Sequence, residues 1–340
     1  MKIAIATDAW QPQINGVVRT LGHTVAHLKE LGHEVRVITP QDFRTYPCPT
    51  YPSIRLAVFP KRGVNRMLRE FRPQAIHIAT EGPIGHAAHS LCRSLSLPFT
   101  TSYHTQFPEY VRARVPLPIS WSYAYLRRYH GRAARTMIAT QSMKRVLQER
   151  GFKNLEIWAR GVDSNLFQPG PKSFLSGNRP ISMYMGRVAV EKNIEAFLGL
   201  DLPGSKYVVG DGPDLEQLRR RYPNVTFTGQ KTGQELTAHI AAADVFVFPS
   251  LTDTFGLVLL EAMACGVPVA AFPVTGPIDV VQQGKTGVLD SDLRKAILGA
   301  LKLDPADCIA YARQHSWRNW TERFASLLEP FEESRWGKMR

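Results

Sequence analysis

Residues 244–271 read DVFVFPSLTDTFGLVLLEAMACGVPVAA, and the pattern of this stretch decides the fold. Its two ends, 244–248 and 267–271, are short apolar runs typical of buried strands, and 257–264 between them has the length of a helix. A strand, a helix and another strand in succession are typical of a parallel sheet that helices cover on both faces. The segment therefore predicts an α/β fold.

The same alternation of strands and helices runs along the chain in two blocks. Between them lie residues 168–180, QPGPKSFLSGNRP, a stretch rich in residues that favour turns and linkers. We therefore predict two doubly wound α/β domains that face a cleft, with ligands bound beyond the carboxyl ends of the strands. The remaining predicted strands are 2–7, 34–39, 75–79, 98–102, 136–139, 181–186, 205–210 and 225–228, and the first predicted helix is 16–31.

Length and composition exclude several classes of protein. The 340 residues exceed what one hydrophobic core usually serves, and 44% apolar with 21% charged residues is typical of a globular chain, not a disordered or fibrous one. The opening KIAIATDAW is broken by Asp8, so it predicts a strand and not a signal peptide. The four cysteines lie far apart, which suggests neither a zinc site nor a disulfide framework. We expect a cytoplasmic protein.

The net charge of +13 is unevenly distributed. Residues 1–170 carry 23 Lys and Arg against 10 Asp and Glu, whereas residues 171–340 carry 19 of each kind. A basic half suggests a polyanionic partner, such as nucleic acid, an anionic membrane surface or a phosphorylated ligand. Solubility alone is the alternative.

Asp253 and Glu261 are candidate site residues in the quoted stretch. The backbone N–H groups of Phe255, Gly256 and Leu257 are predicted to lie at a helix N-terminus, a natural place for an anion. A carboxylate at the helix start can accept hydrogen bonds from sugar hydroxyls, and a deeper one can hold a ribose diol. The alternative is structural, with Asp253 as a helix cap and Glu261 in an internal hydrogen bond.

Residues 185–193, MGRVAVEKN, place cations at the end of another predicted strand. Arg187 and Lys192 flank a predicted helix start. Such a pair can neutralise a diphosphate and stabilise the negative charge that develops as a phosphate leaves. A solvated surface pair is the alternative.

Three motifs, in order, resemble those of the family 4 glycosyltransferases, which have the GT-B fold. The chain carries Gly186-Arg187 with Glu191-Lys192, then VGDGP at 209–213, then an acidic residue and a glutamate separated by seven residues, Asp253 and Glu261. The resemblance covers nearly the whole chain. The family has glutamate as the first acid of the last motif, so the shorter Asp253 departs from the pattern.

The resemblance implies a role for each matching residue. Arg187 and Lys192 would bind the donor diphosphate, Glu261 the ribose, and Asp253 with the amides of 254–257 the transferred sugar. Gly16, in QINGV, matches the glycine loop over the donor phosphates, and His104 matches a histidine of the catalytic cleft. The implied donor-site residues are Gly16, Arg187, Lys192, Asp253, Thr254, Phe255, Gly256, Leu257 and Glu261, and the implied catalytic residues are His104, Arg187, Lys192 and Asp253.

The family's fold and reaction supply further expectations. The terminal helix of the GT-B fold crosses back, which gives a first domain of 1–168 with 317–340 for the acceptor and membrane, and a second of 172–316 for the nucleotide sugar. Members transfer sugar with retention at the anomeric carbon by front-face attack. We expect no metal cofactor, with Arg187 and Lys192 in its place, and we interpret the DSD of 290–292 as a helix cap and not a metal motif.

The basic half holds a segment suited to a membrane surface. Residues 110–135 read YVRARVPLPISWSYAYLRRYHGRAAR, with cations among aromatic residues and a helix predicted from about Ile119. The alternative is a solvated helix face with buried tyrosines. The candidate membrane or acceptor residues are Arg112, Arg114, Trp121, Tyr125, Arg127 and Arg128, and a second cluster is Lys61, Arg62, Arg66, Arg69 and Arg72.

Within the family, SLTDTFG and TEGPIG at 80–85 look most like bacterial transferases that act on membrane lipids. We therefore predict transfer of a hexose or hexuronate to a lipid such as diacylglycerol at the inner face of the cell membrane, with UDP-glucose or UDP-glucuronate favoured as donor. One alternative is a GDP-mannose-dependent mannosyltransferase that acts on a phosphatidylinositol-type lipid, a saccharide or lipopolysaccharide. The other is a nucleic-acid-binding protein, for which the sequence holds no recognisable motif.

Overall fold

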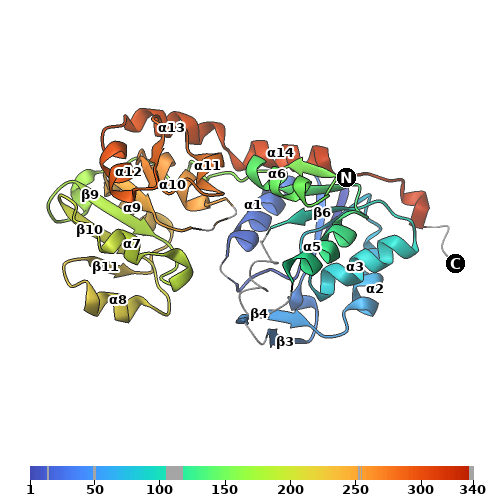
Figure 1. The fold of residues 1–340 in the computed structure, drawn as a ribbon. Coiled ribbons are helices and arrows are strands. Elements are labelled where there is room, and N and C mark those ends of the chain that lie inside the picture. The colour runs from blue at the N-terminus through green and yellow to red at the C-terminus, as the bar shows by residue number, and fades with distance from the viewer. Residues whose placement is uncertain (14, 49–50, 105–117, 252, 254, 337–340) are drawn as a thin grey trace. The chain divides into compact units, whose positions relative to one another are not determined.

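The computed structural model describes residues 1–13, 15–48, 51–104, 118–251, 253 and 255–336. The chain divides into two compact units: unit 1 consists of Met1–Ala159 and Trp317–Arg340, and unit 2 of Arg160–Ser316. Each unit is built on a parallel sheet with helices packed on it (Figure 1). The protein is therefore α/β, with two Rossmann-like domains.

The boundary between the units falls earlier than the sequence suggests. We expected the first domain to reach residue 168, but the first unit ends at Ala159. The segment after it is bonded to unit 2, where the Thr237 hydroxyl donates to the Leu166 carbonyl at 3.2 Å. The turn-rich composition that marks a linker begins only after this bonded segment.

The sheet of unit 1 has the strand order β2-β1-β5-β6-β7-β8, with neighbouring strands parallel. A separate antiparallel hairpin, β3-β4, follows β2. The strands are β1 (Lys2–Ala6), β2 (Glu34–Ile38), β3 (Thr45–Cys48), β4 (Tyr51–Ala57), β5 (Ala75–Ile78), β6 (Thr100–Tyr103), β7 (Arg135–Ile138) and β8 (Leu155–Ile157). The helices are α1 (Gly16–Glu30), α2 (Lys61–Phe71), α3 (Pro83–Ser94), α5 (Ile119–His130), α6 (Gln141–Glu149) and α14 (Trp317–Leu327), with 3₁₀ turns at η1 (Pro40–Asp42) and η4 (Glu333–Trp336).

The sheet of unit 2 has the strand order β11-β10-β9-β12-β13-β14, again with parallel neighbours. The strands are β9 (Ile181–Met185), β10 (Ser205–Val209), β11 (Thr226–Gly229), β12 (Val245–Phe248), β13 (Val269–Ala271) and β14 (Gly287–Leu289). The helices are α7 (Glu195–Leu198), α8 (Leu215–Arg221), α9 (Gly233–Ala242), α10 (Leu257–Ala264), α11 (Pro277–Val280), α12 (Leu293–Ala300) and α13 (Pro305–Gln314), with 3₁₀ turns at η2 (Lys172–Phe174) and η3 (Val190–Lys192).

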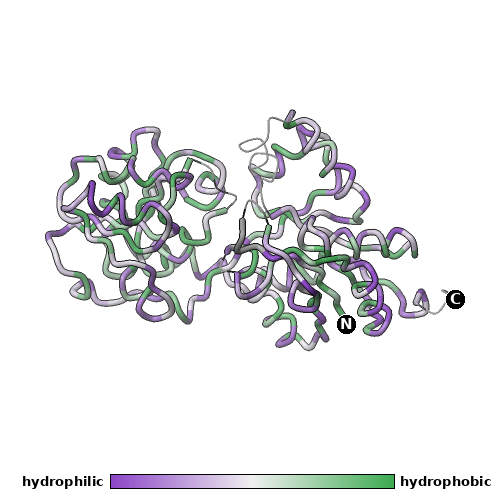
Figure 2. Tube along the Cα trace, turned by 90° about the horizontal axis from the view of Figure 1, so that it is seen from below, coloured by the Kyte–Doolittle hydropathy of each residue, from purple (hydrophilic) through white to green (hydrophobic). Residues whose placement is uncertain are grey.

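Each sheet is buried on both faces, which explains its apolar strands. In β1, Ile3 and Ile5 pack with Leu21 and Leu28 of α1, whereas the alternate Ala4 and Ala6 belong to the core on the other face. Side chains of a strand alternate between the two faces, so a strand in this position has no solvated side. Figure 2 accordingly shows apolar stretches alternating with hydrophilic ones along both units.

Polar side chains cap the starts of two helices, and the sequence predicts one of these caps. The Asn15 carboxamide oxygen accepts from the Val17 and Val18 amides, both at 3.0 Å, at the start of α1. The Asp292 carboxylate accepts from the Arg294 amide at 3.0 Å at the start of α12, which confirms that the DSD of 290–292 includes a helix cap.

His77 on β5 is a fully buried polar group in the core of unit 1. Its two ring nitrogens lie 2.9 Å from the hydroxyl oxygens of Thr100 and Ser102. Its ring meets the Phe324 ring of α14 edge to face, with 4.9 Å between the centroids. Burial lowers the pKa of His77 to about 3, so the ring is neutral in the folded protein.

This burial predicts a pH-dependent stability of unit 1. Below the ordinary pKa of about 6.5, the unfolded chain binds a proton at His77 that the folded protein does not bind. The free energy of unfolding should therefore fall with decreasing pH between about 6.5 and 3, by about 1.4 kcal/mol per pH unit from this one group. Tryptophan fluorescence during urea denaturation reports the unfolding of unit 1 alone, because all six tryptophans lie in this unit.

His77→Gln is the comparison variant, since it retains a polar side chain that does not titrate. The stability of the variant should fall less steeply over the same pH range. Equal slopes for both proteins would show that His77 takes up a proton in the folded state.

Candidate functional site

The candidate site of unit 2 lies at the carboxyl ends of β9 and β12. The strand order reverses between these two neighbours, which is where doubly wound sheets bind ligands. The loop after β9 carries Arg187 and Lys192, and the loop after β12 carries Asp253. The topology therefore brings together two motifs that are 61 residues apart in sequence.

Glycines let two backbones approach closely at this edge. Gly186 and Gly210 both have φ of +151°, and a Cβ at Gly210 would lie 1.9 Å from the Gly186 carbonyl oxygen. A Cβ at Gly212 would lie 2.1 Å from the Val188 carbonyl oxygen. Only glycine fits at 210 and 212, so the VGDGP motif packs the loop after β10 against the loop after β9.

Buried side chains hold the loop after β9 in place. The Tyr184 hydroxyl, at the end of a fully buried side chain, donates to the Arg187 carbonyl at 2.8 Å. The Asn193 carboxamide donates to the Pro249 carbonyl at 3.0 Å and so links this loop to the end of β12. Burial raises the pKa of Tyr184, and the negative charges of Asp253 and Glu191 add to the rise.

Lys192 and Asp253 form an ion pair, with 3.1 Å between the Lys192 Nζ and the Asp253 Oδ2. The other carboxylate oxygen accepts from the Phe255 amide at 3.2 Å. Both charged side chains are largely buried, at 27% and 18% exposed. Water therefore screens this pair less than it screens a pair on the surface. The Lys192 ammonium is still partly exposed, so a ligand anion can reach it.

Arg187 is placed differently from Lys192. Its guanidinium lies 3.8 Å from the Glu191 carboxylate, and its side chain is 57% exposed. Exposed pairs of this kind contribute little to stability. Arg187 is therefore available to bind a ligand anion.

The helix that follows the loop after β12 is α10, which begins at Leu257 and is preceded by Gly256 with φ of +78°. Phe255 is buried beside it, and Glu261 is 3% exposed inside the helix. The structure thus places Asp253 at the loop and Glu261 deep in α10. Thr254, which the sequence also assigns to the site, lies outside the described residues.

In unit 1, the sequence analysis missed Asp8, which follows β1 and is 5% exposed. Its carboxylate accepts from the Thr80 hydroxyl at 2.8 Å and from the Ile84 and Gly85 amides at 2.9 and 3.2 Å. Burial raises the pKa of Asp8 against these hydrogen bonds, which lower it. Asp8 therefore caps α3, and a Cβ at Gly82 would lie 2.4 Å from its carboxyl carbon.

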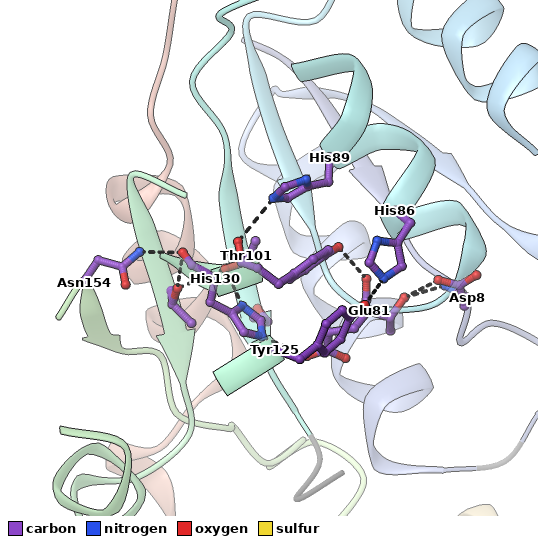
Figure 3. Close-up of polar contacts among 12 residues, drawn as sticks. Asp8, Glu81, His86, His89, Thr101, Tyr125, His130 and Asn154 are labelled. Carbon is purple, nitrogen blue, oxygen red and sulfur yellow. Dashed lines mark hydrogen bonds and ion pairs between the residues drawn. The ribbon is translucent and has the colours of Figure 1, made fainter. Parts of the chain in front are cut away.

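Glu81, which follows β5, was also missed. Its Oε1 lies 3.1 Å from the Nε2 of the buried His130, whose Nδ1 lies 2.9 Å from the Thr101 hydroxyl oxygen. On α3 and α5, His86 and Tyr125 are hydrogen-bonded to each other (Figure 3). The sequence does show an acidic residue directly after a predicted strand. It does not show the partners of Glu81, which lie tens of residues away along the chain.

Gly16 and His104, the predicted site residues of unit 1, lie in different environments. Gly16 starts α1 and is exposed. His104 follows β6 and is 8% exposed, with its ring 5.7 Å from the Trp158 ring at a steep angle. Asp8, Glu81 and His104 follow three adjacent strands, so they share one edge of the sheet.

The predicted membrane helix begins at Ile119, as expected, but its side chains divide into two groups. Trp121 is 68% exposed and Arg128 is also exposed. Arg127 donates instead to the Arg150 carbonyl at 2.9 Å, so it holds the end of α6. Tyr125 is bonded to a histidine, as described above, and the predicted Arg112 and Arg114 lie outside the described residues.

Helix α2 carries a feature that the sequence analysis did not single out. Phe59, one residue before its N-cap Pro60, is 93% exposed and has a φ of +47°. A phenylalanine in the left-handed region is strained, and full exposure of its ring adds a hydration cost. The exposed face of α2 carries Lys61, Arg62, Arg66 and Arg69, with Arg72 at its C-cap.

Residues 1–13, 15–48, 51–104, 118–251, 253 and 255–336 contain no group of three or more His, Cys, Asp or Glu placed to hold a metal ion. In the same part of the chain, no helix has both the length and the apolar character needed to cross a membrane.

Comparisons with known proteins match both units. Residues 14–166 match the family described as Glycosyltransferase Family 4, and residues 179–302 match the one described as Glycosyl transferases group 1. A GDP-mannose-dependent alpha-mannosyltransferase of Corynebacterium glutamicum is 32% identical over 316 residues, which are 85% of this chain and 76% of the relative. The alpha-monoglucosyldiacylglycerol synthase of Streptococcus pneumoniae is 27% identical over 90% of this chain and 79% of its own length.

Among solved structures, HepE of Anabaena in complex with UDP-glucose has a TM-score of 0.70 to this chain. The match covers 96% of this chain and 98% of that one at 17% identity. At this identity the likeness shows a shared fold, the GT-B fold of these glycosyltransferases.

The close approach of the glycine loops gives a prediction for Gly210→Ala. The new Cβ would overlap the Gly186 carbonyl, so unit 2 should lose stability and its thermal midpoint should fall, measured by scanning calorimetry. Gly284→Ala is the matched control: its φ is +73° but nothing lies within 4 Å of the added Cβ. The control should lose only the cost of the left-handed backbone, about 1 kcal/mol. Equal losses in the two variants would contradict the close approach.

Proposed function

The chain belongs to glycosyltransferase family 4 and is a glycosyltransferase, and from this premise we propose that it moves a hexose from a nucleoside diphosphate sugar to a hydroxyl of a membrane lipid. Unit 2 would bind the donor and unit 1 the acceptor. The observation that carries the donor site is the ion pair of Lys192 with Asp253. It joins the cation and the acid of the two sequence motifs at the point where the sheet reverses its strand order.

The proposed reaction needs negative charge to be stabilised on the leaving diphosphate. The bond between the anomeric carbon and the β-phosphate oxygen breaks, and a bond from the anomeric carbon to the acceptor oxygen forms. The acceptor proton passes to the leaving diphosphate, and attack from the same face retains the anomeric configuration. Lys192 and the exposed Arg187 would neutralise the charge that develops, which is the role the resemblance gave them.

Asp253 would act on the sugar and on Lys192 together. Its Oδ1 is held by the Phe255 amide, and its Oδ2 by Lys192. A donor diphosphate would compete with Asp253 for Lys192 and leave carboxylate lone pairs for a hydroxyl of the hexose. Glu261, buried in α10, is proposed to hold the ribose, as the family pattern implies.

The donor base and sugar are the finer part of the proposal. The sequence favoured uridine diphosphate hexoses or a hexuronate. One relative, 32% identical, is named for its dependence on GDP-mannose, and another, 27% identical, is named for a glucosyl lipid product. We therefore propose GDP-mannose and UDP-glucose as the two donors to test first.

The lipid acceptor is supported by the surface of unit 1 as well as by the synthase relative, whose name includes diacylglycerol. Helix α2 buries Val64 and Leu68 and turns its cations to solvent. Cations near an anionic bilayer contribute about 1 kcal/mol each. Phe59 at the start of this helix would insert its ring among the lipids and lose its unfavourable exposure to water.

On this surface α2 with Phe59, and α5 with Trp121 in its first turn and Arg128 in its last, would contact the membrane. Tyr125 and Arg127 were also predicted to do so, but hydrogen bonds inside unit 1 engage their polar ends. We therefore propose that α2 makes more of the membrane contact than α5.

The donor site predicts the effect of replacing Arg187 and Lys192 together with alanine. Loss of both cations should weaken binding of GDP or UDP by about 100-fold, and the free nucleoside should bind equally to both proteins. Isothermal titration calorimetry measures both. Arg219→Ala with Arg220→Ala, on exposed α8 of the same unit, is the charge-matched control. Undiminished diphosphate binding, or undiminished sugar transfer by the double variant, would overturn the proposed site.

The membrane surface predicts selective sedimentation with lipid vesicles. The protein should bind vesicles that contain phosphatidylglycerol and not vesicles of phosphatidylcholine alone, and salt should weaken this binding. Phe59→Ser should lower the vesicle affinity by about ten-fold without lowering the thermal midpoint, since the ring packs on nothing in the folded protein.

Phe174→Ser in unit 2 is the control for this variant, because that phenylalanine is 46% exposed but lies outside the basic surface. It should bind vesicles as the unaltered protein does. Vesicle binding that depends neither on lipid charge nor on Phe59 would contradict the proposal that this surface binds the membrane.

A further inference from the structure

The edge of unit 1 holds a polar cluster that the donor chemistry does not use. It consists of Glu81, His86 and Tyr125, close to the capping residue Asp8 (Figure 3). Glu81 and Asp8 follow β5 and β1, the neighbours between which the strand order of this sheet reverses. Doubly wound sheets bind ligands at this point.

The carboxylates of Asp8 and Glu81 differ in how many of their hydrogen-bonding positions are already occupied. Asp8 is buried, and three donors occupy its oxygens, so it is a structural cap. Glu81 is 24% exposed at the side chain, and His130 is bonded to one of its two oxygens, Oε1. His130 is fully buried and lies against Thr101 through its second nitrogen, so it fixes the direction of the Glu81 carboxylate. Glu81 therefore keeps the capacity to accept a hydrogen bond from a ligand.

His86 and Tyr125 supply neutral hydrogen-bonding groups beside this carboxylate. Burial lowers the pKa of His86, so its ring is neutral near pH 7, and its Nε2 shares a hydrogen bond with the Tyr125 hydroxyl. Tyr125 is 48% exposed, so its ring and its oxygen are open to a ligand.

We propose that Glu81, His86 and Tyr125 form the hydroxyl-binding part of the acceptor site, and that this site takes the hydroxyl of an uncharged lipid and not a phosphorylated headgroup. The proposal rests on the proposed function and names its acceptor class. The lipid hydroxyl donates to the Glu81 carboxylate, and the Tyr125 ring offers an apolar face to the carbon chain.

Charge excludes a phosphate at this place. Burial raises the pKa of the Asp8 carboxyl, and the negative charge of the nearby Glu81 adds a smaller part to that rise. A phosphate here would meet the same repulsion and would find the nearby imidazole without a positive charge. A glycerol or sugar hydroxyl has no such cost, because its hydrogen bond to a carboxylate is charge-assisted. The cations of α2 would instead attract the anionic lipids around the acceptor.

The test compares dioleoylglycerol with phosphatidylinositol as acceptors in the same mixed micelles, with whichever donor the unaltered protein turns over. The unaltered protein should favour dioleoylglycerol in kcat/KM by at least about ten-fold. Glu81→Gln keeps an oxygen for His130 but removes the charge. It should lower kcat/KM for dioleoylglycerol by about ten-fold or more and should not lower it for phosphatidylinositol.

Donor-side readouts separate this role from a structural one. Glu81→Gln should leave the dissociation constant of the nucleoside diphosphate and the slow hydrolysis of the donor without acceptor within about two-fold of the unaltered protein. Tyr125→Phe retains the ring that packs on the carbon chain and removes only the hydrogen bond to His86, so it should lower kcat/KM for dioleoylglycerol by no more than about three-fold. Glu149→Gln, an exposed glutamate of α6 in the same unit, should change none of these quantities.

Three results would overturn the acceptor site. They are an unchanged kcat/KM for dioleoylglycerol in Glu81→Gln, an equal loss of donor binding and acceptor use in that variant, and equal or better use of phosphatidylinositol by the unaltered protein. Absence of sugar transfer to any acceptor by the unaltered protein would instead overturn the proposed function, and the acceptor site with it.

Discussion

Burial of both faces of a parallel sheet is the constraint on which the rest of this protein depends. Every residue of β5 and β12 is buried, so a polar group inside these strands must find its partners there, as His77 does with Thr100 and Ser102. Groups that must meet a ligand are confined to the loops at the ends of the strands. Glu81 in unit 1 and Lys192 and Asp253 in unit 2, which we propose to bind ligands, all stand in such loops. The proposed chemistry is therefore concentrated at one edge of each sheet.

The same constraint explains which parts of the fold the sequence predicts. Each predicted strand is present. Central strands such as β5 and β12 are buried at every residue and form short apolar runs, whereas the edge strand β2 exposes Glu34 and Arg36 and shows an alternating pattern. The short β8 (Leu155–Ile157) and β14 (Gly287–Leu289) were missed, since three residues carry too little pattern. The β3-β4 hairpin was missed because Pro47 interrupts its first strand and only one face of the hairpin needs apolar residues.

For the candidate site, the sequence singles out residues that stand in local motifs and does not single out residues that are marked only by their partners. Arg187, Lys192 and Asp253 stand in motifs, and the structure brings Lys192 to Asp253. Glu81 and His130 are 49 residues apart, and no local pattern indicates that a buried imidazole orients this acid. The strain at Phe59 is likewise a property of the backbone, because nothing in its sequence neighbourhood requires a positive φ. Long-range pairing and backbone strain thus need the structure.

Unit 1 has one surface with positive charge and one edge with negative charge. This division narrows the kind of polyanionic partner that the basic half of the sequence suggests. Five of its cations stand on the exposed face of α2 and at its C-cap, whereas the edge at β1 and β5 carries the acids Asp8 and Glu81 and imidazoles that burial keeps neutral. A polyanion that bound through the whole unit would gain at the first surface and lose at the second. A bilayer differs from such a ligand, because its anionic headgroups and its uncharged lipid hydroxyls are separate molecules. An enzyme that binds to the headgroups while acting on an uncharged hydroxyl needs both surfaces, and needs them on different elements of the fold.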